Sequence, residues 1–159
     1  MTSTVYQNNQ NYIDFILHLA DTNLILAQRI AEWCGHGPIL EQDIAMTNIS
    51  LDLLGQTSNY YNYVAEMVGN GTTEDTLAML REEREYKNLL LVEQPNGHFG
   101  DTVARQFFYD SYHVLLLEQL ATIKDLKLQS IVEKSLKEVK YHLKWSSEWM
   151  IRLGDGTQE

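Results

Sequence analysis

Four polar residues interrupt the apolar stripes of this sequence, and their types are the ones that could do chemistry. They are Asp21, Gln56, Asp110 and His142. A polar group inside a protein core must be hydrogen-bonded, or it costs about 1–3 kcal/mol. Because each of four long amphipathic segments carries one of them, we expect the four side chains to meet one another in the centre of the fold.

The spacing of these residues predicts a duplicated helical hairpin. Asp21 and Gln56 are 35 residues apart, and Asp110 and His142 are 32 residues apart. Two helix pairs with one polar residue on each arm would form a four-helix bundle with a polar centre. Ferritin-like di-metal carboxylate proteins have this arrangement, with a carboxylate on two helices and a Glu-x-x-His motif on the other two.

The ligand set of such a di-metal centre is incomplete in this sequence. No Glu-x-x-His motif occurs anywhere along the chain. Where the first motif is expected the chain has Leu53 and Gln56, and where the second is expected it has Val139 and His142. Metal-binding side chains remain at only three of the six ligand positions, namely Asp21, Asp110 and His142.

We therefore favour a metal-free, hydrogen-bonded core over a metal centre, and we assign no catalytic, cofactor-binding or metal-binding residue. Asp52 is expected to join the polar network, whereas Glu138 is expected to point off the apolar stripe of its helix. Ser111 and His113 follow Asp110 closely but lie on different helix faces, so they offer no nucleophilic site. The alternative is an independent iron-binding protein that uses the remaining acidic and histidine ligands together with water.

Apolar residues at spacings of three and four predict five helices. Glycine and proline clusters separate them, and Thr73 and Asp101 stand where helix starts are expected. The predicted ranges are 9–34, 39–69, 74–92, 101–123 and 127–153. We therefore expect residues 1–159 to form a single all-α domain, a ferritin-like four-helix bundle in which the segment 74–92 is an additional crossover helix.

The composition excludes several classes of function. The chain has 159 residues, 44% of them hydrophobic, and a formal net charge of −10. This charge argues against nucleic-acid partners and anionic membrane surfaces, and no apolar run is long enough to span a membrane. The lone cysteine, Cys34, excludes an intrachain disulfide and fits a reducing compartment; we expect it to be buried. A cytoplasmic location is the expectation, because the N-terminus does not have the pattern of a signal peptide.

The predicted helix 101–123 is apolar almost all round, which is typical of a helix that is buried on every side. It carries aromatic residues at Phe107, Phe108, Tyr109 and Tyr112, followed by three leucines. Two explanations remain open for these faces. One is a fifth helix of the same chain that packs over them, and the other is an interface with another protein chain, where aromatic residues are enriched.

Several runs of sequence are more specific than any helical pattern. They are Glu32-Trp33-Cys34-Gly35-His36, Leu51-Asp52-Leu53-Leu54-Gly55-Gln56, Leu90-Leu91-Val92-Glu93-Gln94-Pro95-Asn96-Gly97 and Tyr141-His142-Leu143. Through them the chain resembles the structural subunits of ring-1,2-phenylacetyl-CoA epoxidases. The resemblance covers essentially the whole chain and corresponds to the N-terminal two-thirds of that family, so we expect a chain that is shortened at its C-terminus.

The resemblance implies a place in a multicomponent mono-oxygenase of phenylacetate catabolism. In that family, electrons pass from NADPH through a reductase, and a di-iron catalytic subunit epoxidises the ring of phenylacetyl-CoA. The structural subunit resembles the catalytic one in fold, has lost the metal ligands and pairs with it as a scaffold. The resemblance thus implies no cofactor in this chain, a di-iron centre in the homologous partner, and contact with other subunits of the complex. A helical interaction module unrelated to oxygen chemistry is a further alternative.

Overall fold

The computed structural model describes the backbone of residues 2–156 and the side chains of residues 9–156. It is built from four long helices, and no strand occurs within this part of the chain. The long helices are α1 (Thr2–Ala31), α2 (Leu40–Val68), α5 (Phe99–Leu120) and α6 (Leu126–Gly154). The shorter ones are α3 (Glu74–Met79), the 3₁₀ turn η1 (Glu83–Glu85) and α4 (Leu90–Glu93). The prediction of an all-helical chain with four long helices is confirmed.

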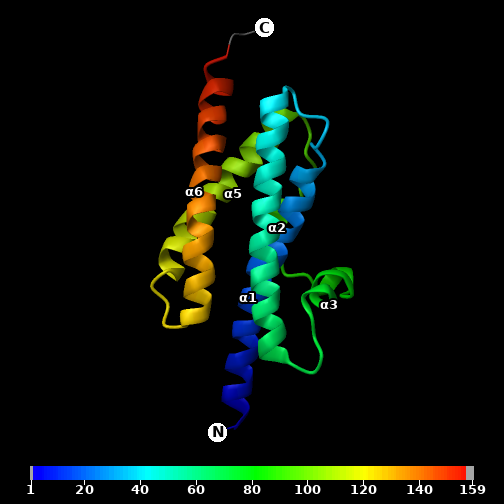
Figure 1. Ribbon diagram of the computed structural model, residues 1–159, viewed down its shortest axis with the longest axis vertical. Helices are drawn as coiled ribbons and strands as arrows, with labels where there is room; N and C mark the ends of the chain where they lie inside the picture. The colour runs from blue at the N-terminus through cyan, green and yellow to red at the C-terminus, as the bar shows by residue number, and fades with distance from the viewer. Residues whose placement is uncertain (1, 157–159) are drawn as a thin grey trace.

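The long helices pair as two hairpins, α1 with α2 and α5 with α6 (Figure 1). The segment between the hairpins, residues 69–98, is called the crossover. It returns the chain to the end of the molecule where α2 begins. There Asn96 donates a hydrogen bond to the backbone oxygen of Arg29, 2.7 Å away. At the same end, the indoles of Trp145 and Trp149 both donate to the side-chain oxygen of Gln42. Because of this long return, α5 runs in the same direction as α2 rather than opposite to it.

The helix ends follow local capping chemistry. α2 ends at Gly69, whose φ of 67° lies in the left-handed region that glycine adopts without strain. Thr73 caps α3 as predicted, because its side chain accepts from the backbone N–H of Thr76. The predicted start of the fourth long segment is wrong in detail. His98 caps α5 and Asp101 reaches back to the N–H of His98, so the two form a reciprocal capping box.

The prediction of one crossover helix over 74–92 is wrong. Only α3, η1 and α4 are helical in this segment, and residues 86–89 are extended. α3 buries a single residue, Leu77, so a longer helix here would gain little from packing. The irregular path of the segment instead allows Arg81 and the backbone of Lys87 to reach a buried carboxylate on α1.

The core consists of two apolar clusters with a polar layer between them. Ile13, Tyr61 and Val132 belong to the cluster around the start of α1, and Leu26 and Met46 belong to the cluster at the opposite end. Along each long helix, buried polar residues stand at the junction between the two clusters: Asp21 and Asn23, Gln56, Gln106 and Asp110, and His142. The polar layer therefore crosses the middle of the bundle.

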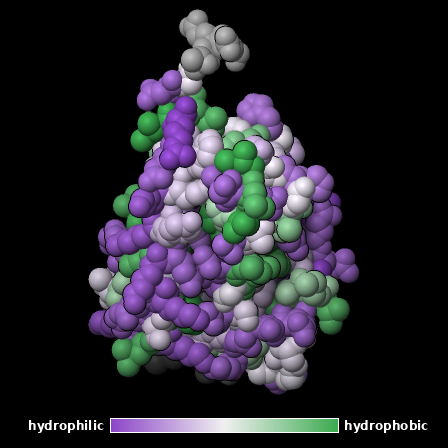
Figure 2. All heavy atoms as spheres, turned by 45° about the horizontal axis from the view of Figure 1, so that its top comes forward, coloured by the Kyte–Doolittle hydropathy of each residue, from purple (hydrophilic) through white to green (hydrophobic). Residues whose placement is uncertain are grey.

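The surface mixes hydrophilic residues with separate hydrophobic patches (Figure 2). The described part of the chain does not cover the outer face of α5, because Phe108, Tyr112 and Leu115 are exposed there. Cys34 is also exposed rather than buried. Among the residues described, no helix has both the length and the apolar character needed to cross a membrane.

Candidate functional site

Asp21 lies on the inner face of α1 and is fully buried. Its carboxylate accepts hydrogen bonds from the hydroxyl of Tyr61 at 2.6 Å and from the backbone N–H of Lys87 at 2.7 Å. The guanidinium of Arg81 donates to both carboxylate oxygens, at 2.5 and 3.0 Å. Burial alone would lower the pKa of Arg81, but the hydrogen bonds and charge of Asp21 outweigh it and raise that pKa. The crossover thus supplies the positive charge that balances this carboxylate.

Gln56 lies on α2 in a second network, which links all four long helices. Its side-chain oxygen accepts from Asn23 on α1 at 3.1 Å, and its amide nitrogen donates to Glu138 on α6 at 2.9 Å. The hydroxyl of Tyr109 donates to the oxygen of Asn23 from α5. The expectation that Glu138 points away from the polar centre is therefore wrong. Both ends of the Gln56 amide are occupied by protein partners.

Asp110 is the centre of a third network, between α5 and α6. Its two carboxyl oxygens accept from Gln106 at 2.6 Å and from Ser146 at 2.7 Å, both of which are neutral donors. Burial disfavours the ionised form and raises the pKa of Asp110 to about 7, although His142 and the two hydrogen bonds act in the opposite direction. The carbonyl oxygen of the Gln106 side chain is buried without a partner.

Two histidines of α5 and α6, His113 and His142, are also buried. The Nε2 atom of His142 lies 3.0 Å from a carboxylate oxygen of Asp52, so Asp52 joins the polar layer as predicted. Burial and, to a smaller extent, the nearby His142 lower the pKa of His113 to about 3. The Nδ1 atoms of both histidines have no hydrogen-bond partner among the described residues. His113 is therefore a neutral ring that packs 4.9 Å from the ring of Tyr109.

The four polar residues singled out in the sequence do not form one cluster. His142 lies close enough to Asp110 to act on its pKa but bonds to Asp52, Gln56 belongs to another network, and Asp21 is held by Arg81 and Tyr61. The two apolar substitutes at the ligand positions lie within the clusters on either side of the polar layer, Leu53 in one and Val139 in the other.

These side chains do not fit a di-metal centre. Leu53 and Val139 have no donor atoms, Gln56 is bonded at both ends of its amide, and Asp21 is engaged by a guanidinium. Within the described part of the chain, no three histidine, cysteine or carboxylate side chains are grouped so that they could hold a metal ion. Of the six ligand positions, only Asp110 and His142 keep metal-binding side chains without a cationic partner.

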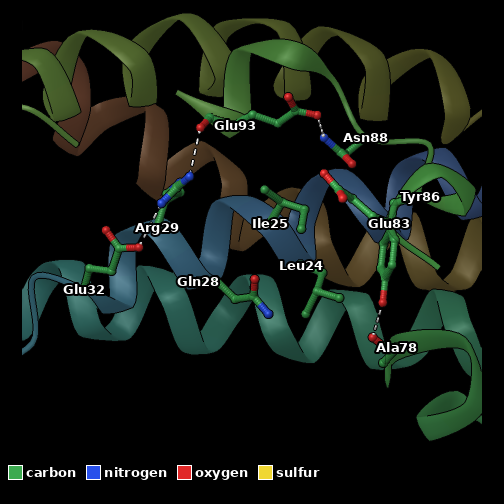
Figure 3. Close-up of a pocket in the computed structure, with 10 residues that line it drawn as sticks. All are labelled: Leu24, Ile25, Gln28, Arg29, Glu32, Ala78, Glu83, Tyr86, Asn88 and Glu93. Atoms are coloured by element: carbon green, nitrogen blue, oxygen red, sulfur yellow. Dashed lines mark hydrogen bonds and ion pairs between the residues drawn. The ribbon is translucent and has the colours of Figure 1, made fainter. Parts of the chain in front are cut away.

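A cavity of about 590 Å³ lies between α1 and the crossover (Figure 3). Most polar side chains at its rim form hydrogen bonds within the chain. Arg29 donates to Glu32 and to the backbone oxygen of Glu93, and Tyr86 donates to the backbone oxygen of Ala78. This cavity is separate from the polar layer, and its lining does not include Asp21, Gln56, Asp110 or His142.

Sequence reasoning missed several residues of the polar layer. Gln106 stands four residues before Asp110, and Ser146 stands four residues after His142, so both share a helix face with a predicted residue. That spacing could have revealed them. No comparable signal marks Arg81, which lies 60 residues from Asp21 in an irregular segment.

Comparisons with known proteins identify the family of this chain. The family model described as "Phenylacetic acid catabolic protein" matches residues 2–159. One of the subunits of the 1,2-phenylacetyl-CoA epoxidase of Escherichia coli (strain K12) is 54% identical over 143 residues. The match covers 90% of this chain and 57% of that protein, so the chain spans less than two thirds of its relative's length.

Proposed function

Since the chain belongs to the phenylacetic acid catabolic protein family, we propose that it is a non-catalytic, structural subunit of a multicomponent di-iron oxygenase. The complex would epoxidise the aromatic ring of phenylacetyl-CoA in aerobic phenylacetate catabolism in the cytoplasm. In this proposal, the oxygen chemistry belongs to a homologous catalytic subunit that holds the two irons. This chain contributes no metal ligand and supports that subunit as a scaffold.

The observation that carries the proposal is the chemistry of the polar layer. A di-metal carboxylate site needs four carboxylates and two imidazoles that point at one another without competing partners. Here two of the six positions are aliphatic and a third is an amide. A fourth, Asp21, is neutralised by Arg81 at 2.5 and 3.0 Å. The guanidinium supplies positive charge where a metal ion would otherwise supply it.

The arrangement of the helices supports a ferritin-like bundle. The chain forms two hairpins that are joined by a long crossover, and polar residues lie near the middle of the long helices. Ferritin-like carboxylate proteins have this arrangement. A subunit that keeps this fold without the ligands would match the shape of a homologous catalytic subunit. The name of the relative, a subunit of an epoxidase, also supports the existence of protein partners.

Two measurements on the purified chain test the proposal. After expression with added iron, elemental analysis is expected to give fewer than about 0.1 iron per chain, because too few ligands remain. The chain is also expected to co-elute with a di-iron catalytic subunit of this family in size-exclusion chromatography. That catalytic subunit, analysed alone for iron, is the positive control.

Two results would contradict the proposal. A content of about two irons per chain, lost in the variants Asp110→Ala and His142→Ala, would identify an independent iron-binding protein instead. Failure to co-elute with the catalytic subunit would remove the scaffold role even if the chain is free of iron.

A further inference from the structure

α5 presents an apolar stripe to the outside of the bundle. Phe108 is 60% exposed, Tyr112 42% and Leu115 66%, although all three have large hydrophobic surfaces. Their spacing of four and three residues places them on one helix face, along about 10 Å of the helix. Aromatic side chains on such a face are characteristic of the central residues of protein interfaces.

This stripe leads into a cavity of about 390 Å³ at the start of α5. Leu91, Pro95, Ala104 and Phe108 form apolar walls, so Phe108 belongs to both the stripe and the cavity. The cavity is also lined by Asp101, whose carboxylate accepts from the backbone N–H of His98 in the cap of α5.

Arg105 lines the same cavity, and the hydrogen bonds of its guanidinium go to neutral acceptors alone. Its side chain is only 4% exposed, and it donates to the backbone oxygen of Gln94 at 2.7 Å and to the side-chain oxygen of Asn96 at 2.8 Å. Both acceptors are neutral, and no carboxylate among the described residues forms an ion pair with it. The Nε atom has no partner among the described residues. Burial and the charge of Arg29 lower the pKa of Arg105 to about 10, although the charge of Glu32 acts in the opposite direction.

A second outward apolar face lies on α2, and it lacks these features. Leu40, Ile44 and Leu51 are 71%, 51% and 59% exposed, but all are aliphatic. Neither of the two cavities is lined by a residue of α2. A buried arginine with unused donors can pair with a carboxylate, and only the α5 face offers one beside its apolar stripe.

We propose that the outer face of α5 docks a helix of the di-iron catalytic subunit, and that a carboxylate side chain of that helix enters the cavity to pair with Arg105. The partner helix presents apolar side chains to Phe108, Tyr112 and Leu115, with an aspartate or glutamate near one end of that contact. This inference rests on the proposed function, and it adds the surface and the chemistry by which the two subunits recognise each other.

The test is the dissociation constant of the complex between the purified chain and the catalytic subunit, measured by isothermal titration calorimetry. Phe108→Glu is expected to weaken binding at least about tenfold, since it places a charge in the apolar contact. Leu51→Glu on α2 is the matched control, because Leu51 is 59% exposed and Phe108 60%. The control is expected to bind within about twofold of the unaltered chain.

Two substitutions test the role of the guanidinium. Arg105→Gln is expected to weaken binding by about tenfold, whereas Arg105→Lys, which keeps the charge, loses less. Because Arg105 also holds Gln94 and Asn96, circular dichroism must first show that each variant is folded. The exposed Phe108 variant tests the same surface without depending on those internal bonds.

Three results would overturn the inference, and they are distinguishable. Weakening by Leu51→Glu but not by Phe108→Glu would move the docking face to α2 and leave the proposed function intact. A homodimer of the chain that Phe108→Glu converts to a monomer would assign the stripe to a second copy. No binding by the unaltered chain would overturn the proposed function, and this inference with it.

Discussion

Asp21 and Asp110 are both fully buried, and each lies on the first helix of its hairpin. The fold nevertheless stabilises the two carboxyl groups in different ways. Asp21 receives a guanidinium, a phenol and a backbone N–H, whereas Asp110 receives only an amide and a hydroxyl. A carboxylate paired with a cation can remain ionised in a core, but one with only neutral partners binds its proton more tightly.

The source of the difference is the crossover. It passes along α1 and brings Arg81 inward, but the second hairpin has no equivalent segment. The five lysines of α6 are all exposed, and none forms an ion pair with Asp110. One bundle therefore shows two ways to accommodate an inward-facing carboxyl group in a protein core.

The largest effect is expected from removal of the cation of the first pair. Arg81→Met leaves Asp21 buried without its counter-charge, and breaking a buried pair in this way costs about 3 kcal/mol. The measurement is the free energy of unfolding in urea, followed by circular dichroism at pH 7. Arg84→Met, an exposed change in the same segment, is the control and is expected to cost less than about 0.5 kcal/mol.

The double variant Asp21→Asn/Arg81→Met sharpens this result. It removes the buried charge together with its partner, so it is expected to be more stable than Arg81→Met alone. If Arg81→Met cost no more than the Arg84 control, the guanidinium would not be balancing Asp21, and the contrast between the two carboxyl groups would fail.

The second prediction concerns the pH dependence of stability at Asp110. Its pKa in the folded state is about 7, above its ordinary value near 4, so the folded protein holds this proton more tightly than the unfolded chain. Stability from this group is therefore fully present below pH 4 and is lost as the pH rises through 7. Asp110→Asn removes this loss, and we expect the variant to gain about 2 kcal/mol relative to the unaltered chain between pH 5 and pH 8.

The difference between the two proteins is the diagnostic quantity, rather than either curve alone. His113, whose pKa is lowered to about 3, acts in the opposite direction, because the unfolded chain binds its proton below about pH 6.5. This contribution is common to both proteins and cancels in the difference. A difference that does not change with pH would show that Asp110 is ionised in the fold despite its neutral partners.

The sequence predicts the surroundings of Asp110 much better than those of Asp21. Periodicity reveals the four long helices because each buries one continuous apolar stripe, and a polar residue within a stripe identifies Asp110 and His142 as parts of a buried network. The crossover has no such stripe, since α3 buries only Leu77, and its path depends on the pairing of Arg81 with Asp21 across 60 residues. A long-range ion pair leaves no periodic signal, so the sequence alone does not show that Asp21 stands apart.

The smallest effects are expected when each of the two carboxyl groups loses one hydroxyl donor. Tyr61→Phe takes a hydrogen bond from Asp21, and Ser146→Ala takes one from Asp110; each is expected to cost about 1 kcal/mol at pH 6. Hydrogen bonds to ionised acceptors are roughly twice as strong as those between neutral groups. The cost of Ser146→Ala is therefore expected to rise between pH 6 and pH 8 as Asp110 ionises, whereas the cost of Tyr61→Phe is expected to stay constant because Asp21 is held in an ion pair with Arg81. Urea unfolding of both variants at the two pH values measures this, and equal pH responses would mean that the two carboxyl groups are in the same state.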